Sequence, residues 1–370
     1  MLLFNARLIG LSIAGLAVSG LALAQEGKTV TTGAESAKLG GEFRSELVYS
    51  DNGLMKQTGV TPEASTRIGV STVNIKLDGK VNSKTDYQFR FNLLNPGARG
   101  PVDIAYGKHW FSNTIGFSIG RQKVIQGGFD NIEGGYRAHA VGIYASNLPF
   151  YEYEDMIGLH VKLAGDLTVQ ILNDRMIGEA GREGSAQWNN TAHQTFAIGW
   201  TGAFGPLSPM VNIGSYDNNK SRWMDLGVKT SMNGLAASLD IYQNTWTNKV
   251  VAAGKAEGKA DVATAITLNL GYTIPGTATP FLYFSTYDNK QEGTDSKVNM
   301  TTAATATAPA SMGWNDNGMV WAIGSDLHMM GNGWSPFVAL VNRSGKWADA
   351  AGKEETKSEM MLKIGAHAEI

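Results

Sequence analysis

The side chains best suited to catalysis are scattered along this 370-residue chain. Asp51-Asn52-Gly53 and Asp316-Asn317-Gly318 predict turns, because a calcium loop needs further oxygen ligands at fixed spacing. The six histidines include no close pair and no H-E-x-x-H spacing for zinc; they are His109, His139, His160, His193, His328 and His367. We therefore predict no enzymatic activity, no cofactor and no metal site.

Charged residues instead recur at every second position of apolar stretches. Glu42, Arg44 and Glu46 alternate with apolar neighbours, and Arg90 does so with Phe89 and Phe91. The same holds for Lys162 after Val161. Side chains on a strand point alternately to its two faces, so these patterns predict strands with one apolar and one polar face. Burying such charges unpaired would cost several kcal/mol each, so the polar face must meet water.

The last twelve residues show the alternation most fully. Met360, Leu362, Ile364, Ala366, Ala368 and Ile370 share one parity, while Lys363 and His367 lie on the other. A chain end holds this order only if a sheet pairs with it. Outer-membrane barrels need the pattern on their closing strand, with lipid outside and water inside.

The first 24 residues have the features of a secretory signal peptide. Arg7 precedes an apolar run from Leu8 to about Val18, and Ala22-Leu23-Ala24 forms an A-x-A cleavage site. We expect cleavage there, a periplasmic lead-in over 25–38 and a barrel domain over 39–370. A single N-terminal membrane anchor is the alternative interpretation of the apolar run.

Composition narrows the class further. The net charge is −2, from 31 Lys and Arg against 33 Asp and Glu, which indicates no nucleic-acid partner. Cysteine is absent, so no disulfide framework supports the fold. After the signal peptide no segment reaches the eighteen or so apolar residues of a spanning helix, so a membrane location must come from strands.

Short turns and long connections alternate along the chain. Tight turns are predicted at 79–83, 112–114, 165–166, 205–206, 233–234, 275–279 and 332–333, where Asn-Gly and Gly-Asp pairs supply positive backbone angles. Seven hairpins plus the first and last strands make sixteen. The predicted strands are 39–50, 66–78, 84–94, 102–111, 114–122, 155–163, 166–174, 194–203, 208–216, 222–231, 235–246, 261–273, 280–289, 318–329, 334–345 and 358–370. The fold class is thus all-β: a transmembrane antiparallel β-barrel of about 16 strands.

The connection after the fifth strand is the largest, from about Lys123 to Glu154. It carries charges between Gly127-Gly128 and Gly134-Gly135. Thirty-two exposed residues would be a costly insertion, so we expect this loop to fold inward. An inward loop would narrow the water-filled centre.

These features resemble the trimeric porins of Gram-negative outer membranes. Their barrels have sixteen strands, and the loop after strand five folds inward to constrict the pore. The run Gly120-Arg121-Gln122-Lys123 with Gly127-Gly128-Phe129 is similar to the same region of phosphate-selective-type porins. The chain departs from that family by ending in Ile370 instead of an aromatic residue and by mixing acids with its inward arginines.

The resemblance implies a pore with charged walls. Carried over by position, Lys123, Asp130, Glu133 and Arg137 are the constriction candidates of the loop. They would face wall residues on the predicted inner side, namely Glu42, Arg44, Arg90, Lys162 and Lys363. Opposed charges in a narrow wet pore create a transverse field that orders water and sets ion preference.

The expected function is passive diffusion of small hydrophilic solutes and ions across the outer membrane. The expected partners are outer-membrane lipids and lipopolysaccharide, the barrel assembly machinery and two further copies in a homotrimer. Three alternatives stay open: a substrate-selective porin of the anion or phosphate type, a non-conducting barrel serving as an adhesin or receptor, and a secreted soluble β-sandwich.

Overall fold

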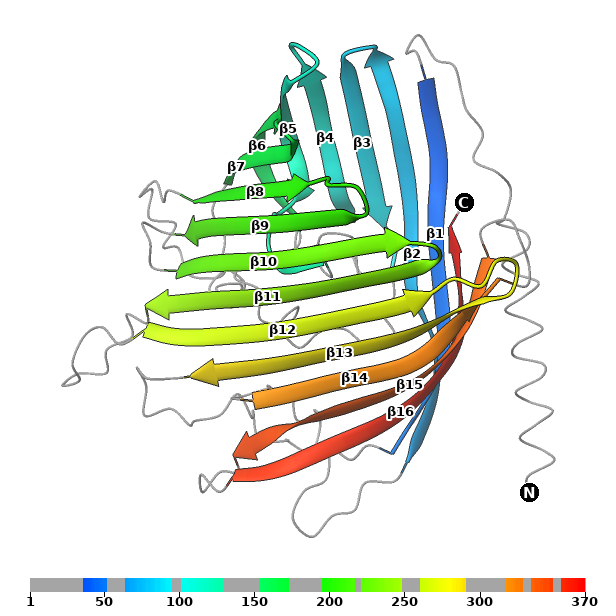
Figure 1. Ribbon diagram of the computed structural model, residues 1–370. Coiled ribbons are helices and arrows are strands. Elements are labelled where there is room, and N and C mark those ends of the chain that lie inside the picture. The colour runs from blue at the N-terminus through cyan, green and yellow to red at the C-terminus, as the bar shows by residue number, and fades with distance from the viewer. Residues whose placement is uncertain are drawn as a thin grey trace, which may run out of the picture.

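The computed structural model describes residues 36–51, 64–94, 101–129, 153–172, 195–216, 221–247, 260–290, 317–328, 334–348 and 354–369. Sixteen strands run through these ranges (Figure 1). They are β1 (Ser36–Ser50), β2 (Ser65–Asn82), β3 (Thr85–Asn92), β4 (Val102–Trp110), β5 (Ile115–Lys123), β6 (Tyr153–Lys162), β7 (Gly165–Leu172), β8 (Phe196–Gly202), β9 (Leu207–Tyr216), β10 (Ser221–Met232), β11 (Leu235–Thr247), β12 (Ala260–Tyr272), β13 (Ala278–Lys290), β14 (Asn317–Leu327), β15 (Trp334–Ala348) and β16 (Glu354–Glu369).

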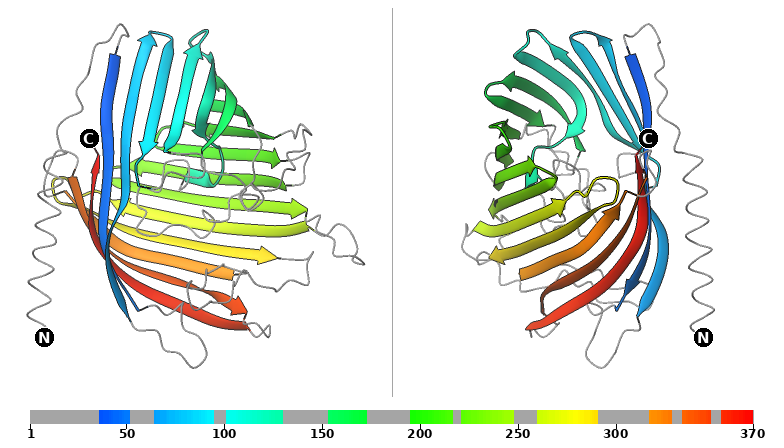
Figure 2. Two further views of the ribbon diagram at one scale, coloured as in Figure 1. Left: turned by 180° about the vertical axis from the view of Figure 1, so that it is seen from behind. Right: turned by 45° about the vertical axis from the view of Figure 1, so that its right-hand side comes forward.

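The strands close into one antiparallel barrel in which each strand pairs with its neighbours in sequence. The first and last strands meet where β1 pairs with β16, from Glu42 opposite Glu369 to Ser50 opposite Met361 (Figures 1 and 2). This seam uses the alternating C-terminal stretch and confirms its prediction as the closing strand. Closure pairs the first strand with the last, so neither is left as an open edge strand where the two run side by side.

Turn chemistry explains where most short connections fall. Asn233 and Gly234 both have positive φ, 50° and 83°, and join Met232 to Leu235 in a two-residue hairpin. Two predicted turns are misplaced. Gly79 to Asn82 belong to β2, and that turn lies at Ser83 and Lys84. Gly165 and Asp166 belong to β7, and the turn lies at Leu163 and Ala164, where Ala164 adopts φ 45°. Asp166 is instead paired with Lys162 in the ladder.

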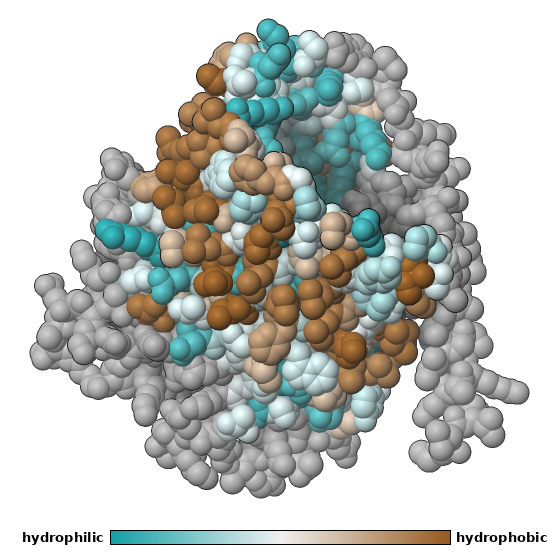
Figure 3. Space-filling view, in the orientation of Figure 1, coloured by the Kyte–Doolittle hydropathy of each residue, from teal (hydrophilic) through white to brown (hydrophobic). Residues whose placement is uncertain are grey.

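The outer face of the barrel is apolar. Large side chains exposed there recur at every second position, as Ile115, Ile119, Ile157 and Leu159 do on β5 and β6. Space filling shows a band of hydrophobic residues over the outer strands, while hydrophilic side chains line the hollow beside it (Figure 3). The polarity is what a bilayer requires of a strand-built wall.

Within the described part of the chain, no helix is long and apolar enough to span a membrane.

Candidate functional site: the inner wall and the segment after β5

The predicted wall residues lie on the inner face, on the parity opposite the exposed apolar side chains. Glu42 is the centre of one cluster across β1, β2 and β16. Its carboxylate lies 3.4 Å from Lys76 Nζ and 3.6 Å from His367 Nε2. It also accepts a hydrogen bond from Asn74 Nδ2 at 3.2 Å. Four residues further along β1, Glu46 Oε2 lies 3.6 Å from Lys363 Nζ of β16.

Basic residues gather on this same wall. Arg67 and Arg343 both act electrostatically on the nearly buried Lys363, and Glu46 and Glu359 compensate part of that charge. Arg44 projects from β1 with its Nε buried, and within the described part of the chain this Nε has no hydrogen-bond partner. The guanidinium and ammonium groups of Arg44, Arg67, Arg343 and Lys363, with carboxylates between them, are called the basic ladder below.

Arg90 pairs with Asp103 across β3 and β4, at 3.2 Å between Nη2 and Oδ2. The register shifts between Arg90 and Phe91, which pair with Ile104 and Val102. Asp103 is therefore the extra residue of a β-bulge. A bulge redirects a side chain, and here it brings the carboxylate to the guanidinium.

The described start of the long connection, Val124 to Phe129, lies inside the barrel. Gln170 of β7 holds its first residues: its Oε1 accepts from Ile125 N at 2.9 Å, and its Nε2 donates to Lys123 O at 2.9 Å. Trp223 of β10 donates from Nε1 to Ile125 O at 3.2 Å. The segment thus leaves β5 and is fastened to the inner faces of β7 and β10.

Two buried carboxylates receive the end of this segment. Gly128 N donates to Asp225 Oδ2 at 3.3 Å, and Phe129 N donates to Asp240 Oδ1 at 3.0 Å. The two acids are 0% and 2% exposed. Asn212 Nδ2 also donates to Asp225 Oδ2 at 3.3 Å. Buried carboxylates persist when such donors satisfy them.

Glycine is required at this anchor for two reasons. Gly128 has φ +69°, a conformation that side chains disfavour. A Cβ added there would lie 2.8 Å from Asp240 Cγ. On the facing strand, a Cβ at Gly227 would meet Asp240 Oδ1 at 2.5 Å. The Gly127-Gly128-Phe129 run is therefore a close backbone approach to the wall.

Part of the inner face is apolar, which sequence reasoning missed. Its members are buried and form one cluster with Ile125 packed against it. The aromatic members are Trp223, Tyr242, Phe281, Tyr283 and Tyr287. A signal was present in β13, where Phe281, Leu282, Tyr283 and Phe284 are apolar on both parities. The inner face therefore carries buried apolar side chains beside the charged ones, most of them along β10 to β15.

Four candidates belong to the connection after β5. Lys123 ends β5, and its carbonyl oxygen accepts the Gln170 hydrogen bond. Asp130, Glu133 and Arg137 lie outside the described residues. Lys162 lies on the inner face of β6, with its Nζ 4.7 Å from the centroid of the Trp110 ring.

Gly116 to Gly120 carries the letters G-x-S-x-G, which sequence reasoning overlooked. The motif supports a nucleophile only on an exposed strand-to-helix turn, yet here it lies within β5. Ser118 is 0% exposed and donates to Gln122 Oε1 at 2.7 Å, so its oxygen accepts from His160 Nε2 at 2.8 Å. Since the hydroxyl proton points to Gln122, His160 is not placed to remove it. The described residues also contain no group of three His, Asp or Glu that could hold a metal.

No protein-family model and no curated protein sequence matches this chain. Several solved structures are similar to it. The trimer form of in-vitro folded OmpT from Vibrio cholerae matches with a TM-score of 0.59 at 12% identity, over 91% of this chain and 100% of that one. An anion-selective porin from Comamonas acidovorans matches with 0.59 at 10%, over 90% and 99%. The outer-membrane channel DcaP of Acinetobacter baumannii matches with 0.59 at 12%, over 94% and 100%.

These likenesses establish the fold. The chain folds as a closed sixteen-stranded antiparallel β-barrel, the fold of these outer-membrane porins and channels. The predictions of strand number and antiparallel closure are confirmed.

Proposed function

We propose that this protein is an outer-membrane porin that passes small hydrophilic solutes and ions by passive diffusion. The closed barrel with an apolar outside and a charged inner wall is the observation that carries the proposal. Sixteen strands enclose a space too wide for side chains of the wall to fill. Small polar solutes would cross along the charged wall of β1–β4, β15 and β16.

The connection after β5 would narrow this passage. Its described start is fixed to β7, β10 and β11 by hydrogen bonds to Gln170, Trp223, Asp225 and Asp240. Asp130, Glu133 and Arg137 follow directly in sequence, so we place them in the constriction. Facing the basic ladder of β1 and β16, they would produce the transverse field predicted for the loop.

Liposome swelling tests the diffusion proposal. Proteoliposomes placed in sugars of increasing size should swell fast with a pentose, slower with a hexose and not at all with a large oligosaccharide. A swelling rate equal to that of protein-free liposomes for every sugar would overturn the proposal and favour a non-conducting adhesin or receptor.

A preference for anions is the second candidate. Arg67, Arg343 and Lys363 gather on one wall with Glu46 and Glu359 as partial compensation, and one structural neighbour is an anion-selective porin. The reversal potential in a KCl gradient distinguishes the cases, because an anion-preferring pore gives the sign set by chloride. Charge removal in Arg343→Met should move that potential toward zero.

We further propose a homotrimer assembled in the outer membrane by the barrel assembly machinery, in contact with lipid and lipopolysaccharide. A neighbour of the same fold is known in trimer form. Native mass spectrometry of the detergent-solubilised protein should give three chains, and a single chain would refute the trimer.

A further inference from the structure

A second inner-wall cluster lies on β4 to β7, away from the basic ladder and the anchored segment. Trp110 is its centre. Lys108 Nζ lies 4.5 Å and Lys162 Nζ 4.7 Å from the centroid of the Trp110 ring. All three side chains lie on the inner parity, because Ile115, Ile119, Ile157 and Leu159 occupy the outer one. Both ammoniums therefore converge on one aromatic surface inside the barrel.

The backbone is shaped to hold this ring. Gly116 is opposite Trp110 in the ladder. A Cβ at Gly116 would lie 2.8 Å from Trp110 Cε3. The indole is thus pressed onto bare backbone of β5. His160 lies next to it, 6.3 Å between ring centroids. Its two ring nitrogens are engaged by Ser118 and Thr168, so it supports the indole without offering a free donor.

The two lysines are not neutralised by direct contact. Asp86 is opposite Lys108 and Asp166 opposite Lys162 in the ladder. Among the described residues, neither ammonium forms an ion pair with them; each lies over Trp110 instead. Asp86 and Asp166 still attract Lys108 from a distance, while Lys162 repels it. Because neither aspartate contacts an ammonium among the described residues, the N–H groups of both lysines can donate to an anion placed between them.

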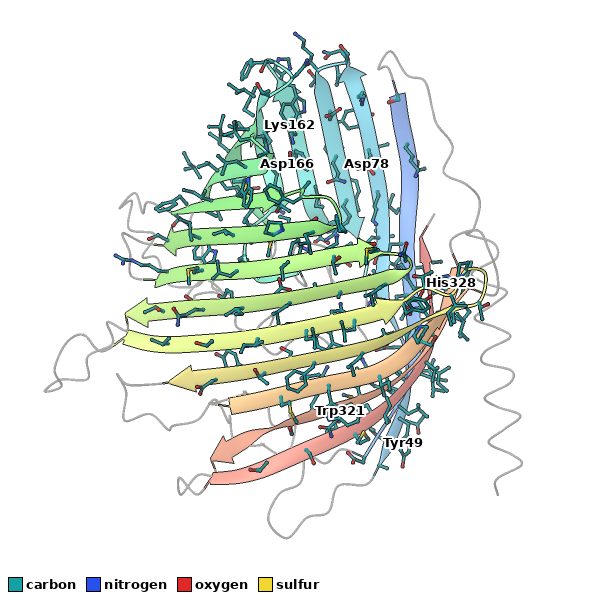
Figure 4. The ribbon with its side chains drawn as sticks, in the orientation of Figure 1. Tyr49, Asp78, Lys162, Asp166, Trp321 and His328 are labelled. Carbon is teal, nitrogen blue, oxygen red and sulfur yellow. The ribbon has the colours of Figure 1, made fainter. Side chains whose placement is uncertain are left out.

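We propose that Lys108, Trp110 and Lys162 form a binding site for aromatic carboxylates. The carboxylate would lie between the two ammoniums, which would move off the indole as the planar ring of the ligand stacks in their place. Lys162 and Asp166 lie beside the short turn between β6 and β7, so the site is at the short-turn mouth of the barrel (Figure 4). An aliphatic anion would lose the stacking, and an uncharged arene would lose both charge contacts.

This inference deepens the proposed porin function, but its test does not depend on conductance. The probe is 4-fluorobenzoate, titrated with folded protein in uncharged detergent and followed by 19F NMR line width. 4-Fluorobenzyl alcohol keeps the ring without the charge, and trifluoroacetate keeps the charge without the ring. We expect saturable binding of 4-fluorobenzoate alone.

Two variants locate the site. Trp110→Leu and the double variant Lys108→Met with Lys162→Met should each weaken 4-fluorobenzoate binding by about tenfold or more, the loss expected for a charge-assisted contact. Lys38→Met is the matched control, since Lys38 is opposite Asp78 on β1 and β2, away from Trp110. It should bind like the parent chain. Heat-modifiable migration verifies that each variant is folded.

Three results would overturn the site: no saturable binding by the parent chain, equal binding of the uncharged alcohol, or unchanged affinity in both folded variants. None of these bears on ion passage, so the site and the porin proposal stand or fall separately.

Discussion

Single residues decide how the segment after β5 meets the wall. Asp225 and Asp240 hold Gly128 N and Phe129 N, and both carboxylates are buried. The two amides offset part of the cost of burying these carboxylates, and Asn212 also donates to Asp225. The position of the segment therefore depends on a few hydrogen bonds to buried acceptors.

Removing an anchor should loosen the segment. In Asp240→Ala, Phe129 N loses its acceptor, so we expect larger open-channel current noise and a changed mean conductance in planar bilayers. Asp78→Asn is the control, because Asp78 pairs with Gln88 on another part of the wall. Identical noise in Asp240→Ala and the parent would show that the bond does not hold the segment.

Alanine variants at Gly128 and Gly205 distinguish the cost of backbone strain from the effect of a steric clash. Both glycines have positive φ, but a Cβ at Gly205 meets nothing within 4 Å. Alanine at either position should cost about 1–2 kcal/mol of backbone energy. Only Gly128→Ala also displaces Asp240, so only it should change the single-channel conductance.

The comparison is made between the two alanine variants in the same bilayer. Equal conductance for Gly128→Ala and Gly205→Ala would contradict the anchor, whereas a change confined to Gly128→Ala would support it.

At the scale of elements, the alternation of apolar and polar residues determines which face of each strand points outward. Phe89 and Gln88 are neighbours on β3 with opposite faces: Phe89 is paired with Leu77 on the outer side, and Gln88 Nε2 donates to Asp78 on the inner side. A lipid-facing charge is costly, while an inner one is hydrated.

Phe89→Lys should therefore destabilise the folded barrel by about 2–4 kcal/mol if the site is near the bilayer midplane. Gln88→Lys should be nearly neutral, since the ammonium meets water and Asp78. Urea unfolding in lipid vesicles, followed by tryptophan fluorescence, measures both. Equal destabilisation would place the two faces in similar surroundings and refute the assignment of outside and inside.

The strands were predictable from sequence because apolar and polar residues alternate every two positions, as the two faces of a strand require. All sixteen strands lie within about four residues of their predicted bounds. The turn at Ala164 was missed because the positive φ of an alanine leaves no sequence signal. The apolar inner cluster was missed because only charged and polar residues were assigned to the inner face, whereas Tyr283 and Tyr287 also lie there.

The site was predictable only in part. Glu42, Arg90, Lys162 and Lys363 lie on the inner face as expected, because their parity is fixed by apolar neighbours. Their partners were not predictable. Asp103 reaches Arg90 through a bulge, and the anchoring of Gly128 by Asp225 depends on contacts 97 residues apart.

At the scale of the whole molecule, the closure of the sheet into a barrel creates the enclosed interior. The pairing of β1 with β16 joins the two ends of the sheet, so the sixteen strands encircle a common space (Figure 2). The segment after β5 is fastened to β7, β10 and β11, whereas the ion pairs of Glu42 and Lys363 lie on β1, β2 and β16. Buried apolar side chains occur on both parts of the wall. Solute passage then depends on the water that the charged side retains.

Single-channel recording of the refolded mature protein in a planar bilayer tests this most directly. The account predicts discrete conductance steps that increase in proportion to KCl concentration, as expected for an open aqueous path. A protein that inserts as a heat-modifiable barrel yet gives no current steps at any salt concentration would contradict it.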